Sequence, residues 1–203
     1  MIKCNVTVCG VIGRDASIRT NKEGKTFLVF PLRVMIPDTD GKTMPIEVDV
    51  SKDTAGKEVS KYRNGSRIEV SGTMYLKHRG DKLYFNLFIN EIRTATADAK
   101  DTVKGELVFR GKVGQHIEEK RDKKDQPYTM FSVFSTEKVE DGFEYQWVRF
   151  FCFGKEREAW LQPGVRVDAK GEISLSAYNG KLNVSCKVEE LVQYVADSSN
   201  SNQ

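Results

Sequence analysis

The residues with the most distinctive chemistry lie in a short alternating segment of the second half of the chain. Trp147, Arg149, Phe151 and Phe153 stand two residues apart, so in a β-strand they share one face. An arginine seldom points into a small core, so this face is expected to be open, where three rings are costly unless they meet a partner. Aromatic rings stack bases for about 1 to 3 kcal/mol each, and a guanidinium contacts phosphates. The segment indicates a nucleic-acid surface; the alternative is that the rings pack under a loop or in a subunit interface.

The element that must position these residues belongs to an internal repeat. Gly10-Val11-Ile12-Gly13 recurs as Gly111-Lys112-Val113-Gly114 at a spacing of 101, and Lys82-Leu83 recurs as Lys181-Leu182 at a spacing of 99. A repeat of this kind indicates two copies of one structural unit. The expected division is a first unit over 1–95, a linker over 96–104, a second unit over 105–195 and a disordered tail over 196–203.

Each unit has the hydrophobic alternation of β-strands. Apolar residues at every second position mark a strand through Leu28 to Ile36 and another through Leu83 to Ile89, and Asn179-Gly180 is a hairpin signal. Only 53–63 and 155–161 have a helical pattern, each between the third and fourth strands. We therefore expect an all-β chain with two five-stranded Greek-key OB-fold barrels in tandem, each with one short helix. A β-sandwich, the alternative, usually needs more strands.

The sequence resembles the bacterial single-stranded DNA-binding protein (SSB) family, written twice. Residues 5–32 resemble the opening of that family, with Gly-x-x-Gly, a basic residue and Asp, and 147–173 resemble its third strand, helix and fourth strand. The resemblance implies a single-stranded DNA-binding protein of replication, recombination or repair. It further implies base stacking by Trp147 and Phe153, a backbone contact by Arg149, a hairpin aromatic at Tyr178, and a homodimer that presents four barrels.

The first unit departs from this pattern in its third strand. There the outward positions are Glu47, Asp49 and Ser51, which repel phosphates, so the stacking role is not transferred to this strand. We expect the first unit to bind weakly there or to use other positions, although each candidate is at least as well explained as a solvated basic rim. These candidates are Arg14, Arg19, Lys22, Lys25, Lys77, Arg79, Lys82, Tyr84 and Phe88.

Composition and charge exclude several classes. The 203 residues are 39% hydrophobic and carry a net charge of +3, and no run reaches the roughly 18 apolar residues that a membrane span needs. Residues 1–100 hold 17 basic and 12 acidic side chains, and 101–203 hold 15 and 17. The sequence thus predicts no membrane partner and a cytoplasmic, nucleoid-associated protein, with reduced thiols at Cys4, Cys9, Cys152 and Cys186.

Catalysis is not expected. His78 and His116 have no metal-ligand neighbour at usable spacing, and the phosphate-loop, nucleophile-elbow and H-E-x-x-H motifs are absent. We expect neither a cofactor nor a metal. The rival to DNA binding is an OB-fold module for protein contact, such as a primosome-type replication-restart factor. The end of the chain lacks the acidic and apolar peptide through which SSB relatives recruit other proteins, so recruitment by that route is not expected.

Overall fold

The first repeat forms a closed five-stranded barrel, here called unit one. A computed structural model describes residues 2–38, 41–54, 58–80, 82–140, 142–154 and 156–195. The barrel strands pair in the order β1-β3-β4-β6-β5 and back to β1, with only β4 and β6 parallel; short β2 extends the hairpin of β3. This order is that of an OB-fold. The bounds are β1 Ile2–Ile12, β2 Ser17–Thr20, β3 Thr26–Pro37, β4 Thr43–Asp53, β5 Arg67–Arg79 and β6 Lys82–Thr94.

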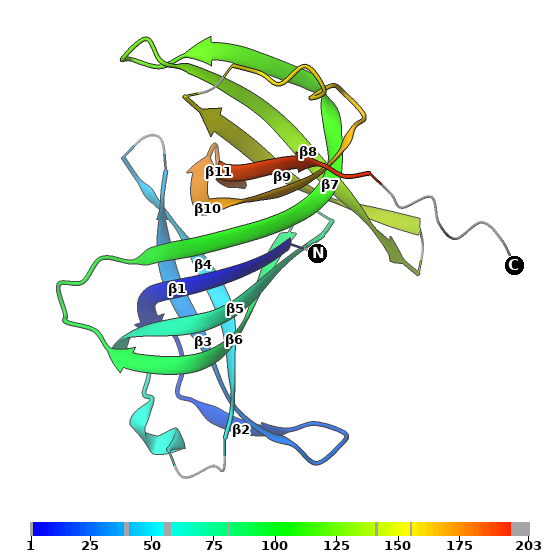
Figure 1. The fold of residues 1–203 in the computed structure, drawn as a ribbon. Helices are drawn as coiled ribbons and strands as arrows, with labels where there is room; N and C mark the ends of the chain where they lie inside the picture. The colour runs from blue at the N-terminus through cyan, green and yellow to red at the C-terminus, as the bar shows by residue number, and fades with distance from the viewer. Residues whose placement is uncertain are drawn as a thin grey trace, which may run out of the picture.

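The second repeat forms the same barrel, here called unit two. Its strands pair in the order β7-β8-β9-β11-β10 and back to β7, again with one parallel pair, between β9 and β11. The two Greek-key barrels predicted from the alternation are therefore confirmed (Figure 1). The bounds are β7 Thr102–Arg121, β8 Pro127–Val139, β9 Gly142–Phe153, β10 Arg166–Tyr178 and β11 Lys181–Gln193.

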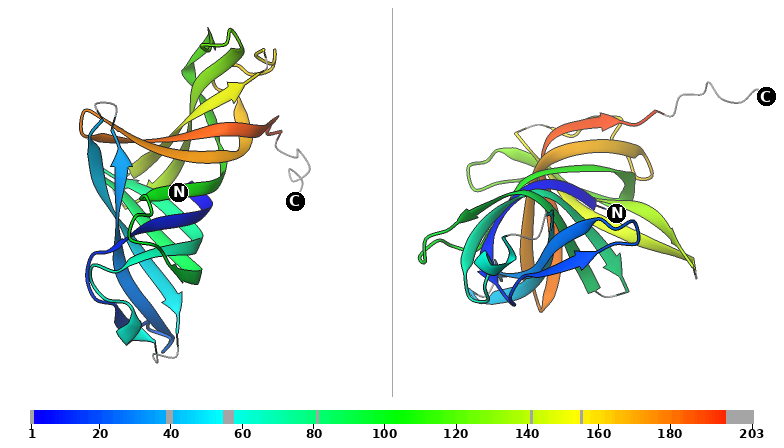
Figure 2. Two further views of the ribbon diagram at one scale, coloured as in Figure 1. Left: turned by 90° about the vertical axis from the view of Figure 1, so that its left-hand side faces the viewer. Right: turned by 90° about the horizontal axis from the view of Figure 1, so that it is seen from below.

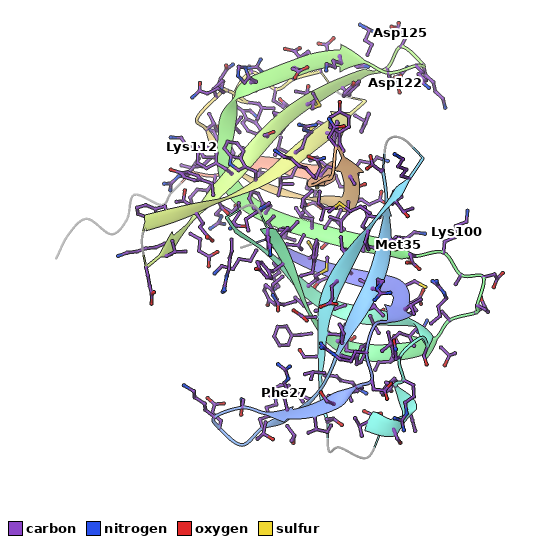
Figure 3. The ribbon with its side chains drawn as sticks, turned by 180° about the vertical axis from the view of Figure 1, so that it is seen from behind. Phe27, Met35, Lys100, Lys112, Asp122 and Asp125 are labelled. Atoms are coloured by element: carbon purple, nitrogen blue, oxygen red, sulfur yellow. The ribbon has the colours of Figure 1, made fainter. Side chains whose placement is uncertain are left out.

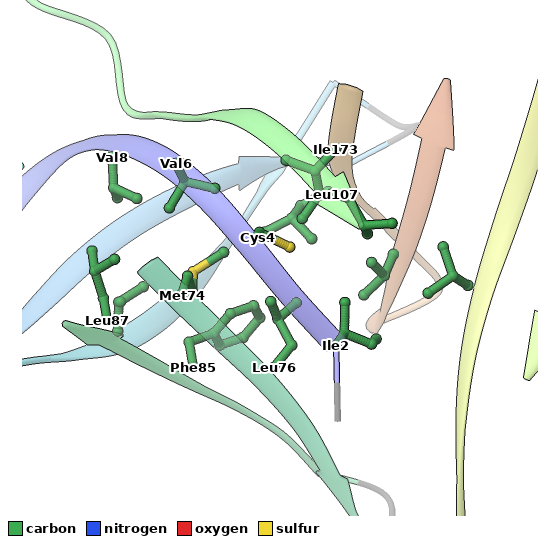
Figure 4. Close-up of a cluster of buried hydrophobic side chains, with 14 of the residues drawn as sticks. Ile2, Cys4, Val6, Val8, Met74, Leu76, Phe85, Leu87, Leu107 and Ile173 are labelled. Atoms are coloured by element: carbon green, nitrogen blue, oxygen red, sulfur yellow. The ribbon is translucent and has the colours of Figure 1, made fainter. Parts of the chain in front are cut away.

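The barrels are filled by the inward residues of each strand. In β4 the buried residues are Ile46, Val48 and Val50, and in β9 they include Val148 and Phe150. These buried residues belong to one apolar cluster that continues from unit one into unit two, as Figure 4 shows around β1. Burial of apolar area on this scale is the main favourable term in folding.

A glycine makes the same close approach in both barrels. A Cβ at Gly72 would lie 2.1 Å from the carbonyl oxygen of Phe88, and one at Gly171 would lie 2.1 Å from that of Lys187. Both glycines adjoin a register shift, in β5 and in β10. Only glycine lets the backbones cross this closely where the barrel bends.

The two barrels are joined by their first strands. β1 and β7 pair antiparallel from Lys3 opposite Val108 to Cys9 opposite Thr102, and Figure 2 shows them side by side between the units. Gly105 lies within this pair, and a Cβ there would be 2.1 Å from the carbonyl oxygen of Asn5. β7 begins at Thr102, so the last three residues of the predicted linker are strand, because they extend the sheet that β1 leaves open.

Side chains add further contacts at this junction. The buried amide of Gln146 on β9 accepts from the backbone N–H of His78 at 2.8 Å and donates to the carbonyl of His78 at 3.4 Å. Lys77 pairs with Glu137 at 2.7 Å. Strand β5 of unit one is thereby bound to β8 and β9 of unit two.

The linker is also held by unit one. The carboxylate of Asp101 accepts from the backbone N–H of Met35 at 2.8 Å and pairs with Arg67. Figure 3 shows Met35 and Lys100 on the same side of the molecule. The end of the linker is therefore fixed before β7 begins.

The predicted helices are not formed in the residues that the structure describes. In unit one a single 3-10 turn, Val59–Lys61, occupies the slot, with 55–57 outside the described residues. In unit two, 156–165 carry turns instead of a helix. Arg157 donates to the carbonyl of Leu161 and to the side chain of Gln162, both at 2.8 Å. Helices this short are marginal alone, so side-chain bonds decide the loop conformation.

The four cysteines form no disulfide. Burial raises the pKa of Cys4 and that of Cys186 to about 12, so both stay protonated and pack as small apolar side chains. No helix within the described ranges is long and apolar enough to span a membrane.

Candidate nucleic-acid interface

The outward face of β9 carries a row of aromatic side chains. Trp147 is 45% exposed and Phe153 is 44% exposed, whereas their inward neighbours Val148 and Phe150 are buried. Arg149 is exposed and Phe151 is half-buried on the same side. Because alternate residues of a strand point to opposite faces, β9 presents three rings and a guanidinium to solvent, in the order that the alternation predicts.

The row is longer than the sequence analysis indicated. Phe143, 64% exposed, and Tyr145 continue the same face toward the start of β9. The sequence could have predicted this extension, because Phe143 and Tyr145 precede Trp147 at steps of two residues and therefore lie on the same face of the strand. The neighbouring strand adds Phe134, whose ring lies 4.7 Å from Trp147, and Tyr128, 5.2 Å from Phe153 between ring centroids. These partners follow from the β8–β9 register, which the sequence did not specify.

The indole of Trp147 packs on one side against the backbone of β7. A Cβ at Gly114 would lie 3.3 Å from Cζ3 of this ring, so the indole lies over the backbone of β7, where glycine leaves room. Gly114 belongs to the repeated motif of the sequence, and at its counterpart Gly13 a Cβ would meet Pro31, at 3.6 Å, and no aromatic ring within 4 Å. One side of the indole is thus supported by protein while nearly half of the residue remains exposed.

The charges around the row favour an anion on Arg149. Hydrogen bonding from Lys120 lowers the pKa of Glu118, with a smaller contribution from Arg149. Lys120 and Glu118 pair at 2.5 Å, whereas Arg149 makes no ion pair within the described ranges. Lys187 on β11 is exposed beside Phe151. The guanidinium of Arg149 and the ammonium of Lys187 are therefore available to a phosphate.

Tyr178 lies away from this row. It is exposed at the tip of the β10–β11 hairpin, where Asn179 and Gly180 have φ of 51° and 71°, as a type I′ turn requires. Within the described ranges no ring contact joins Tyr178 to β9. The preceding residue of β10, Ala177, forms a β-bridge with Asp38 of unit one, so this hairpin reaches toward unit one.

The predicted basic residues of unit one fall into two groups. Arg14, Arg19, Lys22 and Lys25 are exposed on and before the β2–β3 hairpin, and Lys25 pairs with Asp53 at 2.7 Å. In the β5–β6 hairpin, Arg79 and Lys82 are exposed and Arg79 lies 6.0 Å from the ring of Tyr84. Lys77 is occupied by Glu137 of the junction, a partner from the other repeat that local sequence could not reveal.

The third strand of unit one carries the opposite charge. Leu32 pairs with Val48 in unit one as Val133 pairs with Val148 in unit two, so β4 and β9 positions differ by 100. Glu47 then corresponds to Trp147 and Asp49 to Arg149, and both carboxylates are exposed. The outward face that holds rings in unit two is acidic in unit one.

No group of three or more His, Cys, Asp or Glu within the described ranges could hold a metal ion. His78 is half-buried at the junction and His116 is exposed on β7.

Comparison with solved structures found similar chains. The wild-type single-stranded DNA-binding protein from Thermus aquaticus is 11% identical at a TM-score of 0.47, over 100% of this chain and 97% of that chain. The Plasmodium falciparum SSB, solved with ssDNA, is 18% identical at a TM-score of 0.35, over 45% of this chain and 95% of that chain. The N-terminal domain of PriB from Thermoanaerobacter tencongensis is 18% identical at a TM-score of 0.30, over 45% of this chain and 97% of that chain. No protein-family model and no curated protein matches the sequence.

Proposed function

We propose that the chain binds single-stranded DNA along the outward face of β9 in unit two. The observation that carries this proposal is the row of exposed rings interrupted by Arg149 on one strand of an OB-fold. Exposed rings in a row are unfavourable in water but form a platform for unpaired bases. No bond is made or broken in such binding, and no cofactor is needed.

In this proposal each side chain of the row has a role. Bases stack on Trp147 and Phe153, Phe143 and Tyr145 extend the platform, and Arg149 neutralises a phosphate. Duplex DNA is excluded because its bases are already stacked on one another. Work on exposed single strands in replication, recombination or repair fits this binding mode, and a homodimer would present four barrels to one strand.

The test is a titration with oligo-dT that follows tryptophan fluorescence. The chain has two tryptophans: Trp147 on the platform and Trp160, which packs against the core. We expect Trp147→Ala to lose most of the quenching and to weaken binding about 5- to 150-fold, because one stacking contact is worth about 1 to 3 kcal/mol. The control Trp160→Phe should keep both the quenching by oligo-dT and the wild-type affinity. Unchanged quenching and affinity in Trp147→Ala would refute this site.

One observation favours a second function, that of a protein-contact module such as a primosome-type factor. The exposed carboxylates Glu47 and Asp49 suit a basic protein partner better than a nucleic acid. The same titration separates the two functions, since a pure contact module neither binds oligo-dT at low salt nor shows quenching.

A further inference from the structure

A polar groove crosses the outer surface of unit one, and its lining includes neither of the acidic β4 residues Glu47 and Asp49. Its volume is about 980 Å³, and β1, the end of β4, β5, β6, the start of β7 and the base of the β2–β3 hairpin line it. Gly72 and Gly105 lie in its floor. Because neither has a side chain, the crossing strands leave a hollow at the boundary between the first strands of the two units.

Two phenylalanines stand in this groove among polar residues. Phe88 on β6 is 53% exposed, and its only ring neighbour within the described ranges is Tyr75, in an edge contact at 6.1 Å. Phe27 lies on β3 near the β2–β3 hairpin (Figure 3), with the ammonium of Lys25 at 5.4 Å from its ring centroid. The face of Phe88 is therefore open to a planar group.

The remaining lining is cationic and rich in amides. The lining includes Lys25, Lys52 and Lys104. Lys25 pairs with Asp53 at 2.7 Å and Lys52 pairs with Glu58 at 3.0 Å. Lys104 is exposed and makes no ion pair within the described ranges. The side-chain oxygen of Asn5 accepts from Thr73 at 3.2 Å, which turns its amide N–H groups away from Thr73, and Asn90 is exposed opposite.

The equivalent place in unit two differs at the positions of Phe88, Asn5 and Thr73. The barrel registers match Phe88 to Lys187 and Asn5 to Glu106, and Glu172 stands where unit one has Thr73. The places of Asn5 and Thr73 are thus acidic in unit two, and no ring stands in place of Phe88, although Tyr128 stands in place of Phe27. The exposed ring of Phe88 beside the amide of Asn5 is a combination that unit two lacks.

We propose that this groove is a second site for single-stranded DNA, in which a base stacks on Phe88, Lys104 and Lys25 contact phosphates, and Asn5 and Asn90 donate to base edges. The proposal rests on the proposed function of β9 and adds a place for unit one in it. A strand long enough to leave the β9 row would occupy both sites, whereas a short one would occupy the β9 row alone.

The experiment uses the full chain and labelled oligo-dT of two lengths, read by anisotropy and by tryptophan quenching. The short probe has about 8 nucleotides, within the range of about 4 to 16 that one OB-fold occupies, and the long probe has about 35. We expect Phe88→Ala to weaken the long probe about 5- to 150-fold and leave the short probe unchanged. Maximal quenching of Trp147 should stay the same. Lys104→Gln should weaken the binding of the long probe by a smaller factor than Phe88→Ala does, and should make that binding less dependent on salt.

Val192→Ala is the matched control, an exposed apolar truncation in unit two, and thermal unfolding confirms that each variant is folded. The inference is overturned if Phe88→Ala binds the long probe like the control, or weakens both lengths equally. Photo-crosslinking of iodouracil-substituted long probe gives the direct readout. A crosslinked peptide that contains Phe88 supports the groove even if Trp147 proves not to quench, which would refute only the β9 site; crosslinks confined to 143–153 refute the groove and leave the β9 site standing.

Discussion

Strands β4 and β9 are the same strand of the same barrel, yet they present opposite chemistry to solvent. Inward, Val48 corresponds to Val148 and Val50 to Phe150, all buried. Outward, Glu47 stands in place of Trp147 and Asp49 in place of Arg149. Because the side chains of a strand alternate between faces, the core is preserved while the outer face changes completely. The difference teaches that the outer face of a barrel strand can change its chemistry while the residues that fill the core stay apolar.

The last strand of each barrel, β6 in unit one and β11 in unit two, shows the reverse distribution of exposed rings. On β6 of unit one Tyr84 and Phe88 are exposed, whereas β11 of unit two has Asn183 and Lys187 at the matched positions. Each unit therefore carries exposed rings on one of these two strands and not on the other. The two barrels are specialised at different places on one scaffold.

The largest effect is expected from giving unit two the outer face of unit one. In Trp147→Glu combined with Arg149→Asp, a stacking ring and a phosphate contact are both lost and two negative charges approach the strand. We expect at least a 100-fold loss of oligo-dT affinity, about 3 kcal/mol, measured by anisotropy at low salt. Neither side chain is in the core, so the thermal midpoint should stay close to that of the wild type. A loss below tenfold would show that β9 is not the main platform.

The next effect concerns how β9 is held. Gln146 is buried at the junction, whereas its counterpart Pro45 is exposed. Gln146→Ala leaves the backbone N–H of His78 without its acceptor, which should cost about 2 kcal/mol in the free energy of unfolding, measured by urea denaturation. Gln115→Ala, at an exposed position of β7, is the control and should change little. Equal stability of the two variants would mean that the amide does not join the units.

The reciprocal exchange should produce a smaller gain. Glu47→Trp combined with Asp49→Arg gives unit one a ring and a guanidinium but no neighbour like Phe134, since β3 has Arg33 there. We expect affinity for a long oligo-dT to rise about fivefold, near 1 kcal/mol, the lower end of one stacking contact. The double variant Glu47→Gln with Asp49→Asn separates loss of repulsion from gain of stacking. If the two double variants bind alike, charge alone explains the comparison.

The smallest effect is a difference in pH dependence at the junction. Burial lowers the pKa of His78 below its ordinary value of 6.5, against an opposing effect of Glu144. The unfolded chain therefore binds a proton more readily than the folded one, so stability is complete above the ordinary pKa and decreases as pH falls through it. His78→Ala, which copies Ala177 of unit two, should flatten the profile between about pH 7.5 and about pH 5.5. Urea denaturation at each pH measures this, and exposed His116→Ala should keep the wild-type slope.

The sequence predicted what depends on local alternation. The repeat and the period of two predicted both barrels, the open face of Trp147 and Arg149, and the acidic face of Glu47 and Asp49. The helix expected in unit two was not formed, because the hydrogen bonds of Arg157 hold that loop in another conformation; in unit one the slot holds only a 3-10 turn. Phe88 and Lys25 were predicted as separate candidates, but the groove that they share could not be found, since β1, β4, β5, β6 and β7 bring its residues together from distant positions.

The pairing of β1 with β7 has a consequence for how the molecule can vary. In a symmetric pair of identical chains every substitution appears twice, once on each side of the axis. Here the two barrels are joined within one polypeptide, so a substitution at Trp147 leaves position 47 untouched. Dilution cannot separate the halves, because the partner strand is always tethered at high effective concentration. One half can therefore change while its neighbour keeps its own outer face, and in this molecule that face is acidic on β4 and aromatic on β9.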